Sequence, residues 1–85
     1  MPSWPDWWEW ELELSPHLLK RMIDRAFNEA DLRTMLENAV AVRPSDDEDG
    51  RWIVETRSGG KPWEVVVEPV NEDRALVVVT AYAVG

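Results

Sequence analysis

Apolar and charged residues alternate without interruption in WEWELEL, residues 8–14. Strict alternation is typical of a strand with one buried face and one solvated face. The apolar side of such a strand carries Trp8, Trp10, Leu12 and Leu14. Because Pro2 and Pro5 disfavour continuation of a sheet, we expect residues 1–6 to form a loose arm and residues 7–14 to form a strand at a sheet edge.

The pattern changes to helical spacing in the next segment, residues 15–43. Ser15 offers an N-cap hydroxyl, and Pro16 suits a first helical position. Apolar residues then recur at the spacing of an amphipathic helix: Leu18, Leu19, Met22, Ile23, Ala26 and Phe27. Asn28 is a second N-cap candidate, and a second apolar stripe follows it: Leu32, Met35, Leu36 and Ala39. We therefore predict two short helices, the first over residues 16–27.

The last part of the chain, residues 51–84, reads as an antiparallel sheet. Three strand-like runs are separated by the turn signals SGGK and NEDR: residues 51–57, 63–70 and 75–84. AVAVR, residues 39–43, could add a short strand. The predicted fold class is α+β, with two N-terminal helices packed on a four- to five-stranded, mainly antiparallel sheet and an extra N-terminal edge strand. An unprotected edge would favour a homodimer.

The turns also predict how the strands face one another. If SGGK and NEDR are four-residue turns, Val65 lies opposite Thr80 and Trp63 lies opposite Tyr82. Thr80 and Tyr82 would then share the sheet face that supports the helices. A slip of one residue would move both to the other face.

Composition narrows the class of protein. The 85 residues are enough for a single domain, residues 1–85, and the absence of cysteine excludes disulfides and thiolate metal sites. Neither an apolar run long enough to span a membrane nor a signal-peptide pattern is found, so we expect a cytoplasmic protein without a membrane partner. One histidine without cysteine argues against zinc, and RSGGK lacks the spacing of a phosphate-binding loop. We therefore expect neither a metal nor a cofactor.

The net charge of −8 limits the choice of partner. Residues 1–14 and 45–50 each hold four acidic residues and no basic one, whereas the segment between them is nearly neutral. Such a charge opposes long-range attraction of nucleic acid and suits a basic protein partner. A local RNA site remains compatible with the charge, because salt screens acids more than about 10 Å away.

His17, Arg21 and Arg25 recur at four-residue steps, so they lie on one row of the first predicted helix. Cleavage of RNA without metal needs a proton acceptor, a proton donor and guanidinium groups that hold the phosphate, and this row could supply them. The alternative is an ordinary solvated helix face whose arginines pair with nearby acids. The spacing favours this alternative.

Three strand residues could join such a site: Arg57, Thr80 and Tyr82. Arg57 lies at a strand end beside a glycine turn, where functional side chains are common. The alternatives are a cross-strand partner of an acid for Arg57, and packing within the sheet for Thr80 and Tyr82.

Four strings carry a family resemblance: HLLKRMIDRAFNEADLRTML, GRWIVETR, WEVVVEP and LVVVTAYAV. Together they resemble a family of small bacterial proteins of unassigned function that share a helical H-x3-R-x3-R segment and a closing sheet. That family is similar, more remotely, to ribonuclease toxins of the barnase–colicin–RelE class. The resemblance implies that His17 is the base or acid, that Arg21, Arg25 and Arg57 bind phosphate, and that Thr80 or Tyr82 is a supporting hydroxyl.

Two hypotheses of different kinds follow. The first is a toxin-like, metal-independent endoribonuclease that acts on RNA at a local site. The second is a non-catalytic interaction module, similar to an antitoxin or immunity protein, that binds a basic protein through the acidic segments.

Overall fold

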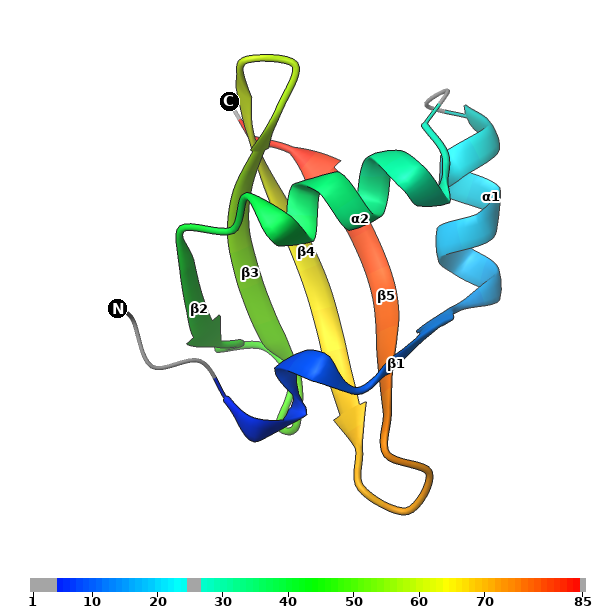
Figure 1. The fold of residues 1–85 in the computed structure, drawn as a ribbon, viewed down its shortest axis with the longest axis vertical. Helices are drawn as coiled ribbons and strands as arrows, with labels where there is room; N and C mark the ends of the chain where they lie inside the picture. Colours follow the sequence, from blue (N-terminus) through cyan, green and yellow to red (C-terminus); the bar gives the residue numbers. More distant parts are fainter. Residues whose placement is uncertain (1–4, 25–26, 85) are drawn as a thin grey trace.

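The computed structural model describes residues 5–24 and 27–84. A short 3-10 helix comes first and is followed by a strand, two α-helices and four further strands. Their bounds are η1 Asp6–Glu9, β1 Glu11–Leu14, α1 Pro16–Asp24, α2 Glu29–Glu37, β2 Ala41–Pro44, β3 Trp52–Ser58, β4 Lys61–Val70 and β5 Ala75–Ala83. The two α-helices and η1 lie on one face of the sheet (Figure 1). The predicted α+β class is confirmed.

The five strands form one sheet in the order β1-β5-β4-β3-β2. Strands β2 to β5 are antiparallel neighbours, as their short connections require. β1 is the expected N-terminal edge strand, and it runs parallel to β5, which is the last strand of the chain. A parallel partner is possible because the connection from β1 to β5 passes through the rest of the fold. Whether this edge supports a homodimer stays a prediction.

The predicted strand over residues 7–14 is wrong in its first half. Residues Asp6–Glu9 form η1, and the strand begins only at Glu11. Trp7, Trp8 and Trp10 all pack against the core, which a straight strand could not achieve because neighbouring side chains point to opposite faces. The Trp7 ring lies 5.5 Å from the ring of Trp52, centroid to centroid. Three tryptophans therefore reach the core because the chain turns once before β1.

Both helix starts contain the expected caps. The Ser15 hydroxyl accepts a hydrogen bond from the Leu18 amide at 3.0 Å. Asn28 and Asp31 form a reciprocal capping box, in which each side chain accepts from the backbone amide of the other residue. The first helix ends at Asp24, earlier than predicted, and Phe27 packs its ring edge-on against Trp63 instead.

The core lies between the helices and the sheet. Its fully buried residues come from both α-helices and from three central strands: Leu18, Leu32, Met35, Val54, Val65, Val67, Leu76, Val78 and Ala81. Thr56 is the buried polar residue, and its hydroxyl donates to the Met35 carbonyl of α2. α1 packs against β5 and α2 packs against β3, so each helix is seated on a different part of the sheet.

The predicted register between β4 and β5 holds next to the turn that joins them and is wrong for the pairs further from that turn. Val67 pairs with Val78, but Val66 pairs with Thr80, so Val79 is an extra residue in β5. The Val79 carbonyl accepts a hydrogen bond from the Ser15 hydroxyl at 2.8 Å, and the Val78 carbonyl accepts from the Ser15 amide at 3.2 Å. The start of α1 thus satisfies carbonyl groups at the bulge. The extra residue places Ala81 in the core and Thr80 on the opposite face.

Candidate functional site

α1 presents a row of one imidazole and two cationic side chains, His17, Lys20 and Arg21, on the side away from the core. Leu18 is completely buried, whereas His17 and Lys20 are exposed and Arg21 is half-buried. Residues 17, 20 and 21 of a helix lie on one face, so these three groups are neighbours. None of the three pairs with a carboxylate in the part of the chain that the structure describes. Arg25, which continues the predicted row, lies outside the described residues.

Other arginines are engaged in ion pairs. Arg33 lies 3.4 Å from Glu29 one turn away on α2, and Arg51 lies 3.2 Å from Glu68. Arg43 contacts two carboxylates, as described below. The α1 row therefore differs from these arginines, because its charges are available to an external anion.

Arg57 lies far from the start of α1. One row of paired residues crosses four strands of the sheet: Leu14 of β1, Val78 of β5, Val67 of β4 and Trp52 of β3. Arg57 is five residues beyond Trp52 along β3. With about 3.3 Å per residue along a strand and about 4.8 Å between strands, Leu14 and Arg57 are roughly 20 Å apart. His17 follows Leu14 in the first turn of α1, whereas Arg57 lines a hollow beside the β3–β4 turn with Thr34 and Asn38 of α2. The structure does not bring His17 and Arg57 to one phosphate.

Thr80 and Tyr82 lie on the face of the sheet opposite the helices, contrary to the predicted register. The Tyr82 hydroxyl donates to a Glu64 carboxylate oxygen at 2.7 Å. Arg43 lies 3.1 Å from the same carboxylate and 3.4 Å from Glu55. The hydrogen bond to Glu64, followed by burial, raises the pKa of Tyr82 above its usual value of 10.0. These contacts cross-link neighbouring strands and account for Tyr82 without an external ligand.

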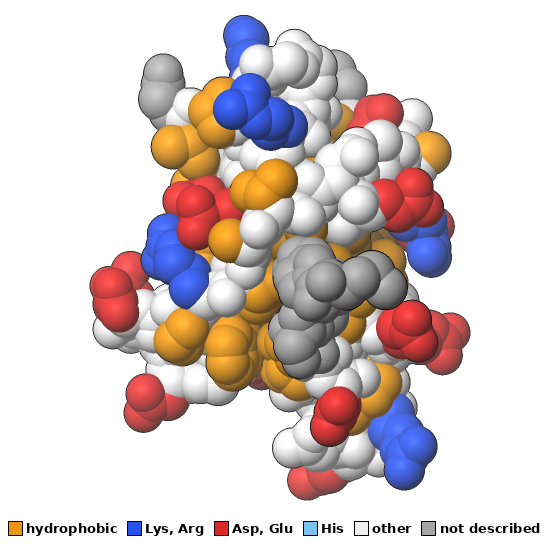
Figure 2. All heavy atoms as spheres, turned by 60° about the vertical axis from the view of Figure 1, so that its left-hand side comes forward, with side chains coloured by type: hydrophobic (Ala, Val, Ile, Leu, Met, Phe, Trp, Pro, Cys, Tyr) orange, Lys and Arg blue, Asp and Glu red, His pale blue; other side chains and the backbone are white. Residues whose placement is uncertain are grey.

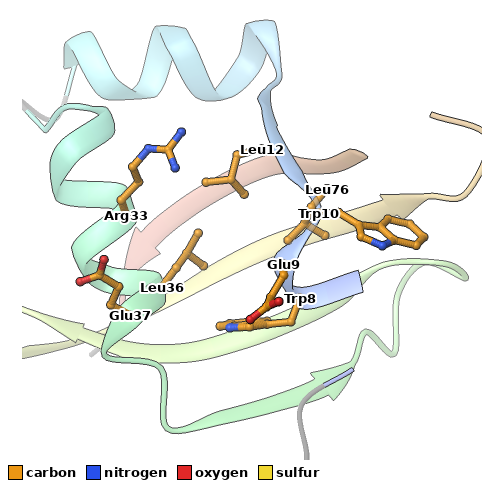
Figure 3. A pocket seen from close by; sticks show the side chains of 8 residues that line it. All are labelled: Trp8, Glu9, Trp10, Leu12, Arg33, Leu36, Glu37 and Leu76. Atoms are coloured by element: carbon orange, nitrogen blue, oxygen red, sulfur yellow. The ribbon is translucent and has the colours of Figure 1, made fainter. Parts of the chain in front are cut away.

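The structure reveals a pocket that the sequence did not predict, between α2 and the segment formed by η1 and β1 (Figure 3). Its cavity has a volume of about 250 Å³. Two indole rings and three leucines line it together with three charged side chains: Trp8, Glu9, Trp10, Leu12, Arg33, Leu36, Glu37 and Leu76. Trp8, Glu9 and Trp10 of the pocket lining belong to the alternating stretch of residues 8–14. That alternation predicted a strand and did not indicate a pocket.

The described residues contain no cluster of histidine and carboxylate side chains that could hold a metal ion. Within the same residues, no helix is long and apolar enough to cross a membrane.

Comparison with known families matches residues 14–83 to the family described as Domain of unknown function (DUF4258). The chain belongs to this family. No curated protein sequence matches it significantly. Among solved structures, the fold is similar to that of the Brucella abortus ribonuclease toxin BrnT, with a TM-score of 0.67 and 19% identity. The likeness covers 89% of this chain and 97% of BrnT.

The DUF4258 match begins at the last residue of β1. It therefore includes the α1 row of His17, Lys20 and Arg21 and all of β2 to β5. It excludes residues 1–13, which supply Trp8, Glu9, Trp10 and Leu12 to the pocket. The α1 row is thus part of the DUF4258 region, whereas one wall of the pocket lies before that region.

Proposed function

We propose that this DUF4258 protein is a toxin-like, metal-independent endoribonuclease whose site is the exposed face of α1. The observation that carries the proposal is the row of His17, Lys20 and Arg21, which has no described carboxylate partner in a chain of net charge −8. The fold shared with the ribonuclease toxin BrnT supports the same function. RNA in the cytoplasm is the substrate class of this proposal.

The reaction needs a proton acceptor, a proton donor and a phosphate clamp. His17 takes the proton of the 2′-hydroxyl, and the 2′-oxygen attacks the adjacent phosphorus. The bond from phosphorus to the 5′-oxygen breaks, that oxygen takes a proton from a solvent molecule, and the imidazole returns its own proton to solvent. The products are a 2′,3′-cyclic phosphate and a 5′-hydroxyl. Arg21 binds the phosphate oxygens and stabilises the charge that develops on them, and Arg25 continues the clamp by its position in the sequence.

The proposal places Arg57, Thr80 and Tyr82 outside the reacting centre. Arg57 is on β3, two strands away from β5, against which α1 packs, and Tyr82 is held by Glu64. Arg57 is therefore a matched control for Arg21, because both are arginines without a described carboxylate partner. If Arg57 instead bound the scissile phosphate, its removal would weaken cleavage as much as removal of Arg21.

The test is RNA cleavage in EDTA by the purified protein and three variants, with 2′,3′-cyclic phosphate ends as the readout. We expect His17→Ala to lower the rate about 100-fold or more, since a positioned acid or base contributes about 10²–10⁴-fold. Arg21→Ala should also lower it strongly, and Arg57→Ala should leave it within about twofold. Absence of cyclic ends with the unmodified protein, or equal rates for it and His17→Ala, would remove the proposal.

A second candidate function is the binding of a basic protein. The contact between Trp7 and Trp52 holds η1 against the strand that directly follows the acidic loop, so the carboxylates of both segments lie on neighbouring surface. Figure 2 shows Asp and Glu side chains around the lower part of the face with the β2 edge, with few Lys or Arg side chains between them. This arrangement favours a cationic partner through electrostatic attraction.

A further inference from the structure

We propose that two copies of this chain associate through the face of the sheet opposite the helices, with the strands of the two sheets running in opposite directions. In the described residues, both α-helices and η1 lie on the other face, so we call this one the bare face (Figure 1). The inference goes beyond the proposed ribonuclease and does not rest on it, because the α1 row lies on the side of the sheet that the helices cover.

The middle of the bare face is apolar. Ile53, Val66 and Val77 alternate along their strands with core residues, so their side chains point away from the helices. Val66 pairs with Ile53 on one side and with Thr80 on the other. Val84, directly after β5, adds a side chain that is 40% exposed. None of these four apolar side chains packs against the core, so they can contact a second protein surface.

The two ends of the sheet carry opposite charge. The end with the β3–β4 turn holds Arg57 and Lys61, and neither has a carboxylate partner among the described residues. The opposite end holds the loops of residues 45–50 and 71–74, which contain six acidic residues and one arginine. Glu13 of β1 extends this acidic end on the bare face, because it alternates with leucines that pack against the core. Figure 2, with the same vertical axis as Figure 1, shows Lys or Arg side chains at the top and mainly Asp and Glu side chains towards the bottom.

This distribution of charge is self-complementary. A two-fold axis that lies across the strands brings the basic end of each copy over the acidic end of the other, because the symmetry makes the same contact twice. The apolar middles then meet between two attractive ends. A cationic protein would be attracted by the acidic end alone and repelled by Arg57, whereas a second copy uses both ends. The bare face therefore fits a second copy better than a basic partner.

The remaining charges of the bare face are compensated within each copy. Arg43 lies 3.4 Å from Glu55 and 3.1 Å from Glu64, and Arg51 lies 3.2 Å from Glu68. Repulsion between two chains of net charge −8 is limited by salt, which screens charges beyond about 8–10 Å. Self-association is therefore compatible with the acidity of the chain.

The area of the bare face is sufficient for a dimer of moderate affinity. With about 4.8 Å between strands and about 3.3 Å per residue, the five strands present a flat area of roughly 550 Å². Projecting side chains and the flanking turns raise the accessible area of each copy towards the about 800 Å² that one partner buries in a standard interface. We therefore expect a dissociation constant of about 1–50 μM.

The experiment is sedimentation velocity of the full chain between about 1 and about 300 μM, a range that brackets this dissociation constant. Val66→Lys places an ammonium group in the apolar middle and should weaken the dimer at least about tenfold. Ile23→Lys makes a matched change at an α1 residue that is 82% exposed on the other side of the molecule, and it should change the dissociation constant by less than about twofold. Circular dichroism shows whether each variant is folded.

A second pair of variants tests the charged ends. Arg57→Glu should weaken the dimer about fivefold or more, because the basic end then repels the acidic end of the other copy. Lys20→Glu makes the same change of charge on α1 and should have an effect of less than about twofold. This pair decides the matter if Val66→Lys does not fold, because Arg57 is exposed.

Three results would overturn the proposal. The first is a monomer at all concentrations, which would mean that solvent or another segment covers the bare face. The second is a dimer that a folded Val66→Lys or the Arg57→Glu variant leaves unchanged, which would place the contact elsewhere, for example at the β1 edge. The third is equal weakening by the members of either matched pair. None of these results bears on RNA cleavage, whose site is on the other side of the sheet.

Discussion

Two adjacent leucines of α1 provide a direct test of how this helix is rotated. Leu18 is completely buried, whereas Leu19 is 48% exposed. Consecutive residues differ by about 100° around a helix, so only one of the two can face the core fully. Replacing each with alanine in turn changes the same side chain in the same helix and differs only in burial.

The expected cost follows from that difference. Leu18→Ala removes a fully buried side chain and leaves a cavity, which costs about 3–5 kcal/mol. For 85 residues the whole free energy of unfolding is roughly 4–13 kcal/mol, so this variant loses a large part of it. Leu19→Ala removes a side chain that is already half in water and should cost about 1 kcal/mol.

The assay is equilibrium unfolding in urea, followed by the fluorescence of the six tryptophans. We expect Leu18→Ala to have a much lower transition midpoint, or to be unfolded without urea, and Leu19→Ala to stay close to the unmodified protein. Equal losses, or a larger loss for Leu19→Ala, would show that α1 is rotated. His17 and Arg21 would then not form an exposed row, and the proposed ribonuclease site would lose its structural basis.

Two further predictions concern local contacts. Asn28→Ala removes the capping box and should lower the free energy of unfolding, measured by urea titration, by about 1 kcal/mol. The control variant Asn71→Ala, in the β4–β5 turn, should change it by less than about 0.5 kcal/mol. Equal losses for the two variants would contradict the capping role of Asn28. The raised pKa of Tyr82 means that the folded state holds the phenolic proton more tightly than the unfolded state does. The hydrogen bond to Glu64 therefore stabilises the fold below a pH of about 10, and this stabilisation is lost as the pH rises through the folded-state pKa. Tyr82→Phe should therefore be less stable than the unmodified protein at neutral pH, and the gap in urea midpoint should narrow above about pH 10; a gap independent of pH would refute the contact with Glu64.

Local signals predicted most of the elements. Ser15 and Asn28 specify their helix starts through side-chain hydrogen bonds within the next turn, so three or four residues contain the information. The same holds for the β3–β4 turn, where Gly59 and Gly60 both have positive φ angles of 58° and 78°. The helix-on-sheet arrangement follows from the apolar faces that these elements must bury.

Features that depend on distant residues could not be predicted. The bulge at Val79 forms where Ser15 reaches the carbonyl groups of β5, and nothing in the local alternation of β5 indicates it. The turn at η1 depends on packing of Trp7 against Trp52 from another part of the chain. For the candidate site, the helical row of His17 and Arg21 was predictable from spacing, whereas its separation from Arg57 depends on strand order.

The parallel pairing of β1 with β5 has a consequence for the order in which the protein folds. Ser15, directly after β1, bonds to Val79, which is 64 positions later in the chain. During synthesis, β1 must wait without its partner while both helices and the other strands are made. Contacts between such distant segments form slowly, because a long loop must close before they can stabilise the chain. We therefore expect the N-terminal strand, and the tryptophan-lined pocket that it borders, to be completed last.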